Sequence, residues 1–192
     1  VPMEETVRAY EDLIRQGKIL NWGVSMWTAE EIEEACALAD RYGGFRPISN
    51  QPSYSILRRE IEAGVLETSE REGLGQIVFS PLAQGALTGK YSGGKIPAQS
   101  RAGDPARNLW MERYLDTKVL DDIDRLRPIA DQLGISLAQL ALAWCLRKPS
   151  VSSVIIGATR IEQLEENVKS IAVELPGDAL AKIDALFPGP GQ

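Results

Sequence analysis

The sequence predicts an α/β protein built on a parallel sheet, and three observations support this class. Short apolar runs alternate with amphipathic helical patterns along nearly the whole chain. The two runs nearest the C-terminus are followed by polar, glycine-rich loops, where parallel α/β folds place their ligands. A length of 192 residues with 44% hydrophobic residues is enough to bury one core of ordinary size.

The predicted strands are short apolar runs, each followed by a helix. They cover residues 19–24, 48–51, 76–80 and 154–156. Because a helix separates each run from the next, the connections are right-handed crossovers, and the strands run parallel in a sheet buried on both faces.

The predicted helices are marked by their capping residues. In three places a Thr or Ser precedes a Glu or Gln by three positions, which is the pattern of a capping box: Thr28–Glu31, Ser136–Gln139 and Thr159–Glu162. Pro128 is expected to bend or split the helix that contains it. The predicted helices cover residues 2–17, 28–39, 59–72, 117–133, 137–147, the segment after 159, and 178–187.

Four parallel strands leave two sheet edges without a partner, and this leaves the architecture open. The chain could be half of an eight-stranded β/α barrel completed by another copy or another polypeptide. It could also be a small doubly wound open sheet. Residues 1–187 are expected to form one domain, and the Pro- and Gly-rich tail at 188–192 is expected to be disordered.

Composition argues against several classes of function. A net charge of −6 and a pI near 4.9 disfavour nucleic-acid binding. No apolar run has the length of a membrane span, and no signal pattern opens the sequence. The absence of histidine excludes a Ser-His-Asp triad and, with only Cys36 and Cys145, a His- or Cys-based metal site. The two cysteines are expected to be small buried hydrophobes, as in a reducing, cytoplasmic compartment.

Two segments carry the chemistry. Residues 79–91 leave a strand, enter a Gly- and Pro-rich loop and end near a lysine, with Arg101 ten residues further on. Residues 157–167 join a strand to a helix N-terminus, where free amides favour an anion. The first segment lacks the glycine spacing and the hydroxyl of a P-loop, and no strand is followed by Gly-x-Gly-x-x-Gly. A mobile basic loop over a phosphate-bearing cofactor is the favoured interpretation.

Four motifs resemble those of a known protein family. They are Asn-Trp-Gly-Val-Ser at 21–25, Asn-Gln-Pro-Ser-Tyr at 50–54, Phe-Ser-Pro-Leu at 79–82 and Val-Ile-Ile-Gly-Ala at 154–158. In order and spacing these resemble the fifth to eighth strands of aldo-keto reductases. Gly-Lys-Tyr at 89–91 and Glu-Asn at 166–167 resemble the branch that includes YghZ-type bacterial reductases and potassium-channel beta subunits. The resemblance runs from residue 2 to about 187 and implies the C-terminal half of a β/α barrel that binds NADP(H).

The resemblance also implies a role for individual residues. By this resemblance, Ser25, Gln51 and the aromatic Phe79 contact the nicotinamide. Ser80, Leu82 and Gln84 form the loop that binds the pyrophosphate, and Lys90 and Arg101 close over it. Gly157, Thr159 and Gln163 bind the adenosine 2′-phosphate, and Glu166 and Asn167 contact the adenine. Arg160, beside Thr159, is a plausible addition that favours NADP over NAD.

Each of these residues also has a purely structural interpretation. Phe79 could be a core aromatic, Ser25 a turn residue and Thr159 a helix cap, while Lys90 and Arg101 could be solvated charges. For Gln51 a binding role is favoured, because a polar amide in a buried strand costs free energy unless it has hydrogen-bond partners.

No catalytic residue is predicted. Reduction of a carbonyl by hydride needs a proton donor, and the family uses a Tyr assisted by Lys, Asp and His, all in the first four strands of the barrel. Tyr91 next to Lys90 is a poor substitute, because neighbouring residues in a loop point apart. The chain alone is therefore expected not to reduce carbonyl substrates appreciably. It is expected to form a homo-oligomer or to pair with a complementing half-barrel. A channel-regulatory role is the weakest alternative.

Overall fold

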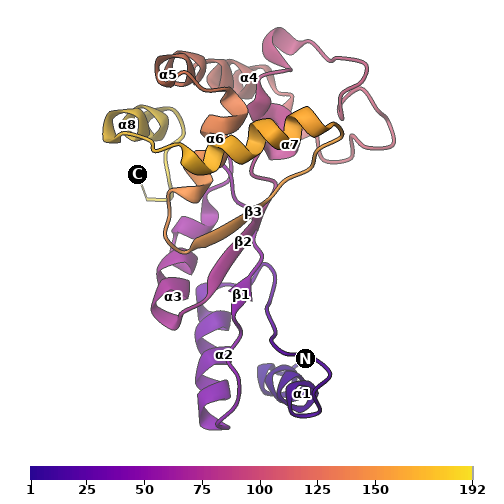
Figure 1. The fold of residues 1–192 in the computed structure, drawn as a ribbon, viewed down its shortest axis with the longest axis vertical. Helices are drawn as coiled ribbons and strands as arrows, with labels where there is room; N and C mark the ends of the chain where they lie inside the picture. Colours follow the sequence, from indigo (N-terminus) through magenta and orange to yellow (C-terminus); the bar gives the residue numbers. More distant parts are fainter. Residues whose placement is uncertain (192) are drawn as a thin grey trace.

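The computed structural model describes residues 1–191 and contains a three-stranded parallel sheet flanked by helices (Figure 1). The strands are β1 (Ser49–Asn50), β2 (Gly75–Phe79) and β3 (Val151–Ile155), in the spatial order β1-β2-β3. β1 pairs with β2 and β2 with β3, both in parallel. The predicted α/β class with a parallel sheet is confirmed.

The expectation of four complete strands is wrong for residues 19–24. This segment forms only an isolated parallel bridge, between Val24 and Asn50. Its backbone bonds β1 and the residue before it, with Val24 N donating to Ser49 O at 2.9 Å and Ile48 N donating to Trp22 O at 2.9 Å. A two-residue partner supports only a short ladder, and Leu20 remains 85% exposed.

The helices fall close to their predicted ranges. In chain order they are α1 (Met3–Arg15), α2 (Ala29–Arg41), α3 (Val65–Glu72), α4 (Thr117–Asp124), α5 (Arg127–Leu133), α6 (Leu137–Leu146), α7 (Ile161–Val168) and α8 (Gly177–Leu186). Short 3₁₀ turns lie at Glu60–Glu62, Ala83–Thr88, Ser92–Gly94, Glu112–Tyr114 and Lys169–Ala172. As predicted, the helix containing Pro128 is split in two, with the proline in the first turn of α5.

The capping boxes at Thr28–Glu31 and Ser136–Gln139 are both present. Two helix predictions need correction. The helix expected over 59–72 begins at Val65, because Gly64 takes a φ of 112° that no helix contains. Thr159 does not cap α7, since Arg160 occupies the N-cap position and the Thr159 N–H donates to Gln163 Oε1 at 2.8 Å.

The main hydrophobic core lies between the sheet and helices α4 to α6. Its largest fully buried side chains include Trp144, Tyr54 and Tyr91. A smaller cluster joins α1 to α2 around Trp22, whose ring stacks on Tyr10 with centroids 4.6 Å apart. In Figure 1, α1 and α2 lie at the foot of the molecule, away from α4 to α8 at the upper end. The N-terminal helices therefore have a cluster of their own.

A network of charged side chains ties the C-terminal helix to the core. Glu62 accepts bonds from Arg59 at 2.7 Å, from Arg147 at 2.8 Å and from the Tyr54 hydroxyl. Arg59 also bonds Asp184 of α8 at 2.7 Å. Burial alone would raise the pKa of Glu62, but these hydrogen bonds lower it. The carboxylate is thus held in its charged form.

One face of the sheet is much less covered than the other. Gln76 and Val78 of β2 are buried beneath helices, whereas Ile77 and Phe79 on the opposite face are only partly buried. Ile155 of β3, in register with Phe79, is 41% exposed. The expectation of a sheet buried on both faces is therefore wrong for the described residues. This exposure is unusual, because the parallel sheets of α/β proteins normally have both faces covered.

Both cysteines are buried and free, as expected. Burial raises the pKa of the Cys145 thiol to about 12 and that of Cys36 to about 11. We predict that neither thiol reacts with Ellman's reagent at pH 8 in the native state, while both react in denaturant. A rapid native reaction of either thiol would contradict the packing of its helix.

The tail begins with Pro188, which is exposed, continues with Gly189, which is buried, and its last residue, Gln192, lies outside the described residues. Over residues 1–191, no single helix has the length and apolar character needed to cross a membrane. α4–α5 and α6 meet that test only as a pair, bent by 87°. The same residues contain no cluster of His, Cys, Asp and Glu that could hold a metal ion.

Candidate functional site

The candidate site lies at the carboxyl edge of the sheet. Phe79 ends β2, Gln51 follows β1 and Gly157 follows β3, while Ser25 comes directly after the bridge residue Val24. Because all these segments run parallel, their C-terminal ends meet at one edge of the sheet. Residues more than a hundred positions apart are therefore brought to the same side of the molecule.

A groove of about 1140 Å³ opens at this edge. It is lined by every predicted cofactor residue except Ser25 and Gln51: Phe79, Ser80, Leu82, Gln84, Lys90, Arg101, Gly157, Thr159, Arg160, Gln163, Glu166 and Asn167. The loop after β2 and the loop after β3 thus face one another across a single space. A dinucleotide has to contact both loops at once, and this arrangement permits it.

The first wall of the groove has an unusual backbone. Ser80, Ala83 and Gln84 all have φ values between 47° and 58°, in the left-handed region that non-glycine residues seldom occupy. Gln84 Nε2 donates to Ser80 Oγ at 2.9 Å, and Arg101 donates to Gln84 Oε1. Successive turns of this kind direct backbone amides into a concave surface that suits an anion.

Gly85 lets a cation approach this wall closely. With a φ of 97°, the residue occupies a conformation that disfavours side chains. A methyl group at this position would lie 2.9 Å from Lys90 Nζ, so an alanine would push the lysine away. The glycine therefore leaves room for the lysine over the loop.

Four cationic side chains line the groove: Lys90, Arg101, Arg107 and Arg160. Arg107 was not predicted as a site residue, because it lies in an irregular segment with no motif around it. Its guanidinium pairs with Asp104 at 3.2 Å. Among the acidic lining residues, Glu166 pairs at 2.8 Å with Lys169, which is not a lining residue of the groove. The cations exceed the acids Asp104, Glu162 and Glu166 by one, in a chain whose net charge is −6.

The second wall includes the N-terminus of α7. No side chain caps this helix, and although the Gln163 amide donates to the Arg160 carbonyl at 3.2 Å, the amides of Ile161 and Glu162 have no hydrogen-bond partner within residues 1–191. The Gln163 side chain folds back to accept the Thr159 N–H and also lies 3.2 Å from the Thr159 hydroxyl. Together with Arg160, these groups offer an anion both hydrogen-bond donors and a positive charge.

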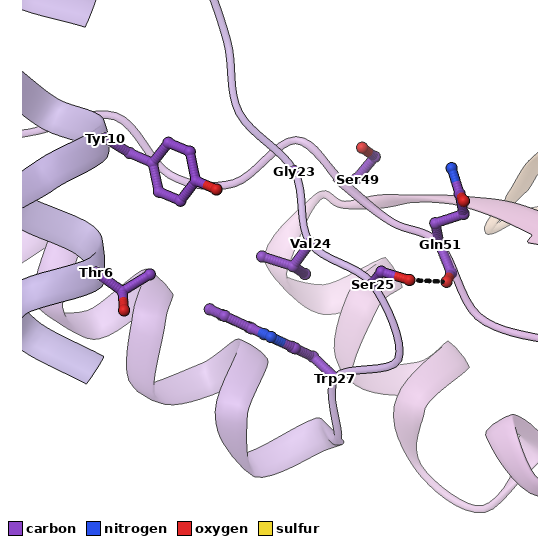
Figure 2. A pocket seen from close by; sticks show the side chains of 8 residues that line it. All are labelled: Thr6, Tyr10, Gly23, Val24, Ser25, Trp27, Ser49 and Gln51. Atoms are coloured by element: carbon purple, nitrogen blue, oxygen red, sulfur yellow. Dashed lines mark hydrogen bonds between the residues drawn. The ribbon is translucent and has the colours of Figure 1, made fainter. Parts of the chain in front are cut away.

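Ser25 and Gln51 line a second pocket, of about 530 Å³, between α1 and the carboxyl edge (Figure 2). The two residues are adjacent, because Ser25 Oγ donates to the backbone carbonyl of Gln51 at 2.8 Å. The argument from a buried Gln51 is wrong, since its side chain is exposed. Two buried amide side chains in the strands are instead Asn50 and Gln76, which bond each other at 3.3 Å.

Tyr54 and Tyr91 are not placed to donate a proton into the groove. Tyr91 is fully buried, and its hydroxyl accepts from Ala102 N at 3.3 Å, whereas the neighbouring Lys90 is exposed and lines the groove. Tyr54 is also buried, and burial raises the pKa of its hydroxyl strongly. Neither tyrosine is among the groove-lining residues.

The carboxyl edge of a parallel α/β sheet is where proteins of this class commonly hold their ligands, and the groove lies at that edge. The model of the aldo/keto reductase family matches residues 1–187, so the chain belongs to the aldo/keto reductase family.

Three relatives extend this finding. A probable voltage-gated potassium channel subunit beta from Arabidopsis thaliana is 47% identical over 174 residues, which cover 90% of this chain and 53% of that protein. The corresponding rice protein is 45% identical over 96% of this chain and 57% of its own length. A putative subunit from Schizosaccharomyces pombe is 41% identical over 97% and 56%. The chain thus spans little more than half the length of these relatives.

Proposed function

We propose that this chain is the NADP(H)-binding half of an aldo/keto reductase. The observation that carries the proposal is the single groove that brings the loop after β2 and the loop after β3 together. Family membership favours a nicotinamide cofactor over other phosphate-bearing ligands. NADP(H), when bound, supplies the hydride for carbonyl reduction.

The residues present fit such a cofactor. In the turned backbone after β2, Pro81 has no N–H and Ala83 N donates to Ser80 O at 2.9 Å, so the amides of Leu82 and Gln84 are the ones that would donate to a pyrophosphate. Lys90 and Arg101 line the same groove. Thr159, Gln163 and Arg160 lie at the uncapped start of α7, which suits the 2′-phosphate that distinguishes NADPH from NADH. Ser25 and Gln51 would complete the nicotinamide end, on the side of the edge nearest to α1.

The same chain is proposed to lack the proton donor. It contains no histidine, and Tyr54 and Tyr91 are buried away from the groove lining. Bound NADPH would therefore be held without transfer of its hydride to an aldehyde. A carbonyl substrate would be reduced only when a second half-barrel supplies the missing acid.

Titration calorimetry with NADPH and with NADH tests the proposal, together with an assay of NADPH oxidation in the presence of 4-nitrobenzaldehyde. We expect saturable binding of one NADPH per groove, NADPH binding at least ~10-fold tighter than NADH, and no oxidation above the background rate. Equal affinities would contradict the role given to Arg160. Sustained turnover would contradict the absence of a proton donor.

A further inference from the structure

Two of the groove cations, Lys90 and Arg101, belong to backbone segments that no regular structure joins. Residues 95–99 between them form no helix or strand and are exposed, and Gly93 and Gly94 just before them have positive φ values. In Figure 1 this stretch belongs to the pink loop at the upper right. The local backbone therefore does not fix the two cations relative to each other, and their placement depends on contacts across the loop.

Tyr91 makes contacts with both segments. Its ring is fully buried, and Lys90 Nζ lies 5.3 Å from the ring centroid. Its hydroxyl accepts a hydrogen bond at 3.3 Å from the N–H of Ala102, the residue after Arg101. The Arg101 guanidinium in turn donates to Gln84 Oε1 on the first wall of the groove. Arg101 is thus held next to its backbone by the tyrosine and at its side chain by the glutamine.

The turn that carries this tyrosine is fixed from the opposite side. Arg127 of α5 donates from Nη2 to Gly89 O and to Ser92 Oγ, both at 2.8 Å. Its Nε donates to Asp124 of α4 at 3.0 Å. Gly89 has a φ of 73°, and a methyl group there would lie 2.6 Å from Arg127 Nη2, so the glycine is what permits this contact. The turn is therefore anchored to α4 and α5.

We infer that Tyr91 is a positioning residue for the groove, because its hydroxyl holds Arg101 beside Lys90 before any ligand binds. The ring packs in the main core, whereas the hydroxyl bonds the segment that carries the arginine. Cations that are held in place in advance lose less conformational freedom when an anion binds. The inference rests on the proposed function, since it is the phosphates of NADPH that these two cations would contact.

Tyr91→Phe tests the inference, because it removes the hydroxyl and keeps the ring. We expect this variant to bind NADPH ~5-fold more weakly in titration calorimetry, which is about the contribution of one neutral hydrogen bond. Tyr114→Phe changes another buried tyrosine that lies outside the groove lining, and it should leave the affinity unchanged. An affinity of Tyr91→Phe equal to that of the wild type would overturn the inference.

A double-mutant cycle separates positioning of the arginine from a general effect on the fold. In the Arg101→Gln background there is no arginine to position, so Tyr91→Phe should cause no further loss of NADPH affinity. In the Lys90→Gln background Arg101 is still present, and the ~5-fold loss should persist. A loss of the same size in the Arg101→Gln background would mean that the hydroxyl does not act through the arginine, and it would overturn the inference.

Amide hydrogen exchange without any cofactor tests the bond itself. The Ala102 amide should exchange at least ~5-fold faster in Tyr91→Phe than in the wild type. The Gly85 amide, which bonds Leu82 O at 2.8 Å in the turn after β2, should be unchanged and serves as the internal reference. Unchanged exchange at Ala102 would overturn the inference and leave the cofactor function standing, because binding of NADPH to the wild type is measured separately. Faster exchange at Ala102 in a chain whose wild type binds no NADPH would overturn the cofactor function and leave the placement of Arg101 by Tyr91 standing.

Discussion

Replacing Glu62 with glutamine is expected to lower the free energy of unfolding by ~3 kcal/mol. The carboxylate is almost buried and is shared by Arg59 and Arg147, both of which bond it at less than 3 Å. Its removal leaves two guanidinium groups near one another, and of the two carboxylates that pair with Arg59 among residues 1–191, Asp184 remains. Breaking a buried pair costs more than the pair contributes, because a charge is left uncompensated.

Urea unfolding at pH 7 measures this loss, with Glu60→Gln as the control. Glu60 is an exposed neighbour whose carboxylate lies 3.6 Å from Arg58, so its loss should stay within ~0.5 kcal/mol. Similar losses in the free energy of unfolding for the two variants would contradict the stabilising role given to the Glu62 network.

The effect of Glu62 should also depend on pH. The pKa of Glu62 is lower in the folded chain than in the unfolded chain, so its stabilisation is present above the unfolded value and is lost as the pH falls through the folded one. The difference in stability between the wild type and Glu62→Gln should therefore be largest above about pH 5 and should shrink below about pH 4. A difference that grows on acidification would contradict this assignment.

The largest effect on ligand binding is expected from removal of two cations of the groove. The double variant Lys90→Gln/Arg101→Gln should bind NADPH ~100-fold more weakly, since each charged hydrogen bond to a phosphate contributes ~1.5 kcal/mol. Both side chains are exposed and stand at the loop after β2, so the fold should survive the change. Calorimetry gives the affinity, and circular dichroism checks the fold.

The matched control is Lys95→Gln/Arg125→Gln, which removes the same charge from exposed positions outside the groove lining. This variant should change the affinity less than ~3-fold at physiological salt. An equal loss in both double variants would mean that net charge, and not contact with the phosphates, governs binding.

The sequence predicted the parts of the fold in which a local pattern and the tertiary environment agree. The three formed strands lie within a few residues of their predicted positions, and two of the three capping boxes are present. Pro128 splits its helix because proline removes a backbone donor and clashes with the preceding turn. These signals are local and need no knowledge of distant residues.

The misses have non-local causes. Residues 19–24 have the composition of a strand, but a strand needs a partner along its length, and β1 provides only two residues. Thr159 matches a capping pattern, yet the Gln163 side chain takes its N–H and the helix begins beyond Arg160. Gln51 was expected to be buried because both faces of the sheet were expected to be covered. Each outcome depends on contacts that spacing in the sequence does not encode.

The sequence indicated the two loops of the candidate site, and the cofactor roles of their residues stay predictions. The two loops identified from their glycines and charges do line one groove, although only the fold could bring them together. Arg107 was not predicted as a lining residue, because an isolated arginine in an irregular segment has no distinguishing pattern. The separation of Ser25 and Gln51 into a second pocket follows from the position of α1, which the sequence does not specify.

The most direct measurement of the central claim is amide hydrogen exchange with and without NADPH at a saturating concentration. A coenzyme that spans the groove should slow exchange both in residues 80–90 and in residues 157–163, and both regions should respond with the same midpoint of titration. Protection confined to one of these loops, or absent from both, would contradict a single dinucleotide site.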